Sequence, residues 1–104
     1  MAQAGKRVYV INQGAHDYTA AEYFGDIIYC TKGSVDRFDT SQMFRELLEA
    51  LHDSQADDYI LLTSLTTLCC VACSIMAAKH GQVNLLLFRG DAYVERTLYL
   101  KNIT

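Results

Sequence analysis

Hydroxyl side chains gather at one turn near the middle of the chain, directly after the apolar run Tyr59–Leu62. The four residues are Thr63, Ser64, Thr66 and Thr67. The segment that follows, Leu68–His80, is apolar on nearly every side and is expected to be a helix. A continuous apolar run such as Tyr59–Leu62 is typical of a strand buried on both faces of a parallel sheet. Such sheets bind ligands at the carboxyl ends of their strands, where a helix N-terminus attracts phosphate or carboxylate. We therefore expect an anion-binding site at this turn.

The same hydroxyls have a plainer structural interpretation. A Ser or Thr at a helix start ordinarily serves as the N-cap and accepts a backbone hydrogen bond. One hydroxyl would meet that need, whereas Ser64, Thr66 and Thr67 supply three in four positions. Both interpretations, a helix cap and a ligand site, stay open at this turn.

A second group of polar side chains follows the first predicted strand, Arg7–Ile11. In its exit loop, Asn12 and His16 are suited to hydrogen-bond a base edge or a ribose, and Tyr18, or Phe38 further along the chain, is suited to stack on a base. His16 is also the candidate general acid or base if the protein is an enzyme, because histidine titrates near neutral pH. The alternative is a simple turn stabilised by Asn12, with Asp17 capping the next helix.

Two cationic residues follow the second predicted strand, Asp26–Cys30, at the same edge of the sheet. Lys32 and Arg37 would neutralise a phosphate, Arg37 through a bidentate fork. In the alternative interpretation they belong to a solvated loop and pair with Asp36 and Asp39.

Motifs that would identify a reaction are absent from the sequence. There is no Gly-x-Gly-x-x-Gly and no Gly-Lys-Ser/Thr, which argues against the usual dinucleotide-binding and triphosphate-hydrolysing folds. The four cysteines, Cys30, Cys69, Cys70 and Cys73, do not have the spacing of a metal site, and we expect them to be buried apolar side chains. No Ser–His–Asp or Cys–His set is visible. We expect no cofactor, no metal and a binding protein rather than an enzyme.

Apolar periodicity predicts five strands and three helices. The strands are expected at Arg7–Ile11, Asp26–Cys30, Tyr59–Leu62, Val83–Phe88 and Tyr93–Leu100. The helices are expected at Thr19–Phe24, from Asp39 or Thr40 to Leu51, and at Leu68–His80. This alternation predicts a single α/β domain over residues 1–104, with a mostly parallel, Rossmann-like or flavodoxin-like sheet in the order 2-1-3-4-5. A C-terminal antiparallel hairpin would form one edge, and right-handed crossovers would place helices on both faces.

Composition restricts the classes of partner. The net charge of −3 argues against non-specific binding of duplex nucleic acid, which requires a basic surface. The longest apolar run is too short to span a bilayer, and we expect a cytoplasmic protein that does not bind membranes. Hydrophobic residues make up 51% of the chain, a surplus that self-association would cover. We therefore expect a homo-oligomer.

Most of the chain, from Arg7 to Leu100, resembles small α/β proteins of bacteriophages and prophages. The resembling segments are Val8–Asn12, Gly14–Tyr18, Ala20–Gly25, Asp58–Thr66, and Lys79–Gly81 followed by Asn84–Leu87. The resemblance implies a phage accessory protein that acts in the infected bacterial cell. Small phage proteins often oppose host defence, some by sequestering nucleotide signals, so the resemblance also implies an anti-defence role.

These observations lead to one hypothesis and two alternatives. We expect the protein to capture a small phosphorylated ligand, a nucleotide or cyclic-nucleotide immune signal, without turning it over. The first alternative is a phosphodiesterase or other nucleotide-processing enzyme that uses His16 in the same pocket. The second is a protein–protein inhibitor of a host factor, which would bind through the outward-facing Arg45, Glu49 and His52.

Overall fold

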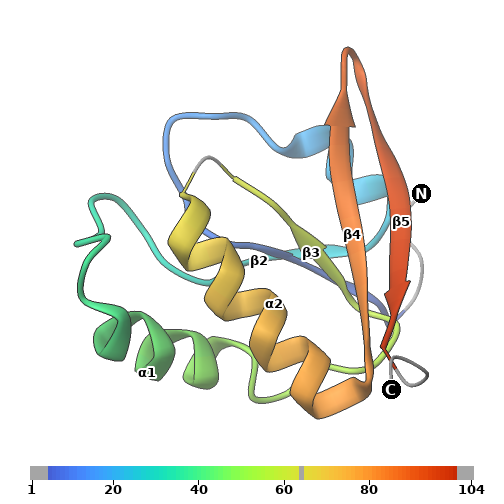
Figure 1. The fold of residues 1–104 in the computed structure, drawn as a ribbon. Coiled ribbons are helices and arrows are strands. Elements are labelled where there is room, and N and C mark those ends of the chain that lie inside the picture. Colours follow the sequence, from blue (N-terminus) through green and yellow to red (C-terminus); the bar gives the residue numbers. More distant parts are fainter. Residues whose placement is uncertain (1–4, 64, 101–104) are drawn as a thin grey trace.

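The sheet has five strands in the order β2-β1-β3-β4-β5, as predicted, within a mixed α/β fold (Figure 1). The computed structural model describes residues 5–63 and 65–100. Three strand pairings, β1 with β2, β1 with β3 and β3 with β4, are parallel, and β4 with β5 is antiparallel. In chain order the elements are β1 (Arg7–Val10), the 3-10 helix η1 (Thr19–Tyr23), β2 (Asp26–Tyr29), α1 (Thr40–Ala50), β3 (Tyr59–Leu61), α2 (Thr66–His80), β4 (Gln82–Arg89) and β5 (Ala92–Tyr99).

Strand β1 is buried on both faces. Its side chains alternate, with Val8 and Val10 in one core cluster and Tyr9, followed by Ile11, in the other. Each of these four side chains is at most 1% exposed. The continuous apolar run therefore marks a central strand, as a parallel sheet requires.

Both long helices pack on the same face of the sheet (Figure 1). Helix α1 begins after Asp39, whose carboxylate accepts a hydrogen bond from the Gln42 backbone N–H at 3.0 Å. It buries Met43 and Leu47 on the side that faces the core, while the opposite side is charged. Helix α2 lies beside α1 and contributes five buried residues to the same layer: Leu68, Cys69, Ala72, Ile75 and Met76.

The other face of the sheet has a thinner cover. The connection from β1 to β2 contains a loop and the five-residue η1, of which Ala21 is buried. Aromatic side chains of the connection, Tyr18 and Phe24, complete this cover, and Phe24 packs on Tyr59 of β3. Helices were expected on both faces of the sheet. On this face the short η1 is the helix of the β1–β2 connection, because the rest of that connection is loop.

Helix α2 begins at Thr66 rather than at Leu68 as predicted. Thr66 and Thr67 therefore lie in the first helical turn, where backbone N–H groups have no intrahelical acceptor. Leu65 occupies the N-cap position and makes no side-chain capping bond. Ser64, the other hydroxyl predicted for this turn, lies outside the described residues.

The four cysteines differ in exposure. Cys69 is buried, Cys30 and Cys73 are half-buried, and Cys70 is exposed, and all four thiols are free. The expectation of burial is thus wrong for Cys70, because that side of α2 faces away from the sheet. None of the helices in residues 5–63 and 65–100 is long and apolar enough to cross a membrane.

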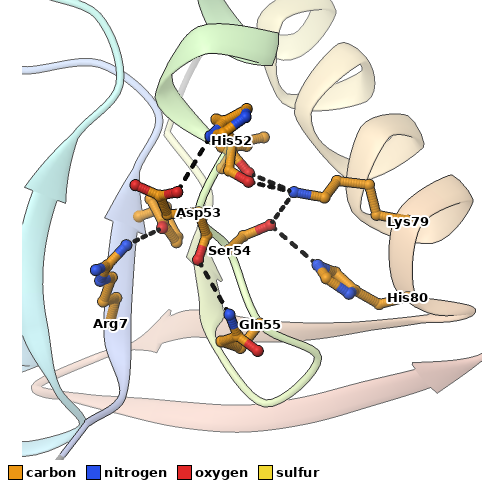
Figure 2. A network of polar contacts seen from close by, with 9 residues as sticks. Arg7, His52, Asp53, Ser54, Gln55, Lys79 and His80 are labelled. Atoms are coloured by element: carbon orange, nitrogen blue, oxygen red, sulfur yellow. Dashed lines mark hydrogen bonds and ion pairs between the residues drawn. The ribbon is translucent and has the colours of Figure 1, made fainter.

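A polar network holds together the segment that follows α1 and the end of α2 (Figure 2). The ammonium group of Lys79 donates to Leu51 O at 2.7 Å, to His52 O at 2.9 Å and to Ser54 Oγ at 3.1 Å. Ser54 Oγ also lies 2.9 Å from His80 Nε2. Lys79 thereby satisfies carbonyl groups that the end of α1 leaves without a helical partner.

Asp58 fixes the start of β3 against β1. Its side chain is 1% exposed and accepts hydrogen bonds from the backbone N–H groups of Arg7, at 3.0 Å, and Gln55, at 2.7 Å. A buried carboxylate requires such donors, because an unsatisfied one would be costly. Asp58 therefore links this end of the sheet, which lies opposite the strand ends at which a ligand site was predicted, to the segment before β3.

Candidate functional site

A crevice of about 420 Å³ lies at the carboxyl ends of β1 and β3, where the sequence predicted a site. Its lining consists of Asn12, Gly14, Ala15, His16, Tyr18, Leu61, Leu62, Thr63, Leu65, Phe88 and Tyr93. The volume falls within the range of about 300–1,000 Å³ that small-molecule sites occupy. The crevice brings together four of the predicted residues, which are Asn12, His16, Tyr18 and Thr63.

Asn12 shapes the wall of the crevice through its amide group. Its Nδ2 donates to Gly33 O at 3.1 Å, and its Oδ1 accepts from Thr31 Oγ1 at 2.7 Å. The backbone continues this connection, since Gln13 and Lys32 form an isolated parallel bridge beyond the ends of β1 and β2. Asn12 therefore ties the loop after β1 to the loop after β2, which fixes the position of the crevice wall.

Aromatic rings form one side of the crevice. The ring of His16 lies 4.9 Å from that of Tyr18 and 6.4 Å from that of Phe88, measured between centroids. Phe88 in turn lies 5.3 Å from Tyr93. These four rings come from the loop after β1 and from the β4–β5 hairpin, so the cluster exists only in the folded chain. Rings in this arrangement provide a surface for a planar, unsaturated ligand.

Thr63 lies in the crevice lining at the turn before α2. Its Oγ1 accepts a long hydrogen bond of 3.4 Å from the Leu65 N–H, and its carbonyl oxygen lies 3.5 Å from Cys69 Sγ. These contacts shape the turn and leave the first-turn N–H groups of α2 without a cap from Leu65. Such groups favour an anion.

A second cavity, of about 310 Å³, adjoins the crevice at Leu65, which lines both. Arg37, Thr66 and Thr67 line this cavity, together with the apolar Val35, Met43, Leu65 and Leu68. Three further predicted residues are therefore collected here, beside the crevice and not within it. Within the described lining of the two cavities, Arg37 supplies the positive charge.

Lys32 is separate from both cavities. It lines a smaller hollow of about 180 Å³ whose described lining includes the acidic residues Asp36, Asp39 and Glu46. Attraction to these carboxylates competes with attraction to a phosphate. The structure thus groups the predicted residues by location: four in the crevice, three beside it and Lys32 among acidic side chains.

The electrostatics of the crevice favour neutral groups. Its described lining contains no Asp, Glu, Lys or Arg. Burial raises the pKa of Tyr18, and burial followed by the charges of Tyr18 and Asp17 raises the pKa of Tyr93, so both phenols stay protonated at neutral pH. Asp17 itself accepts hydrogen bonds from the Thr19 hydroxyl and backbone N–H, which lower its pKa and keep it ionised.

No catalytic set is assembled around His16 within residues 5–63 and 65–100. Its imidazole is exposed and packs on the rings of Tyr18 and Phe88, and no carboxylate or nucleophile is hydrogen-bonded to it there. Ser54 and His80 do form a hydroxyl–imidazole pair, but Ser54 is 5% exposed and none of the cavities described here includes it. In the part of the chain described, no three His, Cys, Asp or Glu side chains are grouped to hold a metal ion.

The other candidate surface lies on the charged side of α1. Arg45 and Glu49 are exposed there, and His52, exposed just after the helix, pairs with Asp53 at 3.1 Å. This surface is distant in the chain from the crevice residues, and its described residues form no ring cluster.

Sequence reasoning missed Phe88, Tyr93 and Leu65 as lining residues. A signal for the two aromatic residues was present, because Arg89-Gly90-Asp91-Ala92 predicts a tight turn, and a tight turn places Phe88 opposite Tyr93. The structure shows this cross-strand pair, and Gly90 adopts a positive φ of 71° at the turn. Their position over the crevice could not be read from the hairpin alone.

The fold is thus a small mixed α/β domain with a ring-lined crevice at the carboxyl edge of its sheet. Residues 6–99 match the family described as phage Pam3 gp32-like protein, and the chain belongs to this family. The comparisons with curated proteins and with solved structures found no match. The resemblance to phage proteins is confirmed at the level of the family, and the ligand must be argued from the site.

Proposed function

We propose that this phage protein captures a nucleotide-type ligand at the carboxyl edge of its sheet and does not turn it over. The base would enter the ring-lined crevice beside His16 and Tyr18, and Thr63 would contact the sugar or phosphate. The phosphate would lie near Arg37 and the first turn of α2. The ligand class follows from this pairing of a ring-binding surface with a cationic, donor-rich one.

The observation that carries this proposal is the position and lining of the 420 Å³ crevice. A flavodoxin-like sheet with the order 2-1-3-4-5 binds its ligand between the first and third strands, at the carboxyl ends. The crevice lies at that point, and the cavity with Arg37, Thr66 and Thr67 adjoins it at Leu65. The crevice and the adjoining cavity together therefore offer what a nucleotide needs, a surface for its base and a cationic, donor-rich place for its phosphate.

A sequestering role suits this chemistry. Sequestration needs affinity and no reacting groups, and His16 packs on aromatic rings without a hydrogen-bonded partner among the described residues that would make it a catalytic acid or base. Because the chain belongs to a phage family, we propose that the captured ligand is a nucleotide or cyclic-nucleotide signal of host defence. The protein would act in the cytoplasm of the infected cell by lowering the free concentration of that signal.

Calorimetry against mono-, di- and cyclic nucleotides tests the proposal. We expect at least one member of the panel to bind, and the Thr66→Ala, Thr67→Ala double variant to bind it at least ~10-fold more weakly while its circular dichroism stays unchanged. A panel without any binding would contradict the proposal. Chromatography of each mixture after long incubation is expected to return the nucleotide intact; product that disappears in His16→Ala would show an enzyme instead.

A further inference from the structure

The tip of the β4–β5 hairpin contributes an exposed aromatic ring to the site. Phe88 is 56% exposed, although it contacts both Tyr93 and His16. Register pairing places Phe88 directly opposite Tyr93, which fixes the two rings on the same face of the hairpin. In Figure 1 the hairpin tip extends past the rest of the sheet, on the side of the loop after β1. The Phe88 ring is therefore held in place by neighbours while much of its surface stays free.

The aromatic side of the crevice, to which Phe88 belongs, disfavours negative charge. No Lys or Arg belongs to its described lining, and Asp17 lies close enough to contribute, after burial and Tyr18, to the raised pKa of Tyr93. A phosphate placed there would meet an apolar, aromatic wall and a nearby carboxylate. The base of a nucleotide meets no such penalty.

The adjoining cavity has the opposite character. Arg37 and the first turn of α2 line it, and among the described residues Leu65 is shared by the two cavities. A ligand that occupies both must pass over Leu65 with an uncharged ring on one side and an anionic group on the other. The two cavities therefore determine the orientation of the ligand, with its ring in the crevice and its anionic group beside Arg37.

We propose that Phe88, supported by Tyr93, is the residue that recognises the ring of the ligand, and that ring recognition is separable from phosphate binding. This inference rests on the proposed function and adds to it the chemical class bound in the crevice, a neutral planar heterocycle such as a nucleobase. A nucleoside without phosphate thus binds the crevice by stacking, and the phosphate adds affinity through Arg37. Stacking tolerates any base, so Phe88 sets the preference for rings over other phosphorylated compounds.

Matched calorimetric titrations with adenosine and adenosine monophosphate test the inference, with the guanine, cytosine and uracil pairs treated in the same way. We expect Phe88→Ala to weaken nucleoside and nucleotide by the same factor, about 5- to 150-fold, the range for loss of one base–aromatic stack. Phe88→Trp keeps a stacking surface and is expected to restore binding. Arg37→Gln is expected to weaken the nucleotide ~10-fold and leave the nucleoside unchanged.

The controls separate stacking from folding. Tyr99→Ala removes a 72% exposed ring at the opposite end of the same hairpin and is expected to leave both affinities unchanged. Phe88→Leu keeps an apolar side chain without a π face and should behave like Phe88→Ala. If nucleotides bind and Phe88→Ala leaves their affinity unchanged, the inference is overturned and the proposed function stands. If neither nucleosides nor nucleotides bind, both are overturned.

Discussion

At the scale of single residues, burial separates the thiols into reactive and inert groups. Burial raises the pKa of Cys30 to about 12, and burial together with the neighbouring Cys69 and Cys70 raises the pKa of Cys73 to about 11. Alkylating reagents attack the thiolate, which these two residues hardly form at neutral pH. Cys70 is the exposed cysteine of α2.

We therefore predict that iodoacetamide at pH 7.5 modifies Cys70 before Cys30 and Cys73. Peptide mass spectrometry over a time course measures the three rates. The Cys70→Ser variant is expected to lose the fast phase and keep the slow ones. Equal rates at Cys30 and Cys70 in the folded protein would contradict the assigned burial.

Residue contacts also explain which site predictions came together. Asn12 was predicted to face a ligand, and it lines the crevice while its amide group already holds Thr31 and Gly33. Lys32 was predicted to support the same site, but it lies among Asp36, Asp39 and Glu46. The loop alternative for Lys32 proposed pairing with Asp36 and Asp39; Lys32 shares a hollow with both, but no ion pair joins it to either within the described residues.

At the scale of elements, the network between α1 and α2 depends on the protonation state of His80. Lys79 uses its three N–H groups on Leu51 O, His52 O and Ser54 Oγ, so Ser54 accepts from Lys79. The hydroxyl proton of Ser54 is then free to bond His80 Nε2, which must be unprotonated to accept it. A protonated Nε2 would place a second cation beside Lys79 and remove this acceptor.

We predict that acid weakens this junction and with it the fold. Burial, and then repulsion from Lys79, lowers the pKa of His80 below its ordinary value of about 6.5, against a smaller opposing effect of Asp58. The unfolded chain therefore binds a proton more readily than the folded one. The stability that neutral His80 contributes is fully present above pH ~6.5, the pKa of histidine in the unfolded chain. It is lost as the pH falls below that value and through the lower pKa that His80 has in the folded protein.

Urea unfolding between pH 5 and 8 measures this effect. The His80→Gln variant keeps an acceptor for Ser54 and does not titrate, so its unfolding free energy is expected to change less with pH than that of the wild type. Superimposable pH profiles for the two proteins would contradict the role of His80. The carboxylates contribute equally to both profiles, which makes the difference specific to the imidazole.

At the scale of the whole molecule, large apolar side chains remain at the surface. They include Phe44 and Leu48 of α1, exposed by 48% and 43%, and Leu98 and Tyr99 of β5, exposed by 50% and 72%. Contact with a second copy would remove such surface from water. The homo-oligomer inferred from composition stays a prediction. These exposed residues are the candidates for its interface.

Light scattering coupled to size-exclusion chromatography is expected to give a mass of at least twice 11.7 kDa at high micromolar concentration. A doubly charged variant, Phe44→Glu with Leu48→Glu, tests whether the α1 side takes part, since two carboxylates in an interface would each have to be desolvated. It is expected to lower the mass if α1 forms the contact. A wild-type mass of 11.7 kDa at that concentration would remove the prediction.

The sequence by itself determined the order of the elements, the strand order and the edge of the sheet at which a cavity is found. Local spacing was sufficient, because a buried strand, an amphipathic helix and a tight hairpin turn each depend on residues close together in the chain. Connection rules then led from element order to β2-β1-β3-β4-β5, and the carboxyl ends of parallel strands necessarily share one edge.

Only the tertiary structure decided which side chains at that edge share a cavity. Phe88 and Tyr93 reach His16 because the hairpin extends past the sheet, and Arg37 and Lys32, five positions apart, line different hollows because the intervening loop turns. The tertiary structure also decided which face of the sheet each helix covers. Both long helices pack on one face, and aromatic rings cover much of the other. Such distances depend on sheet twist and loop conformation, which arise from packing between distant segments and have no signature in local residue spacing.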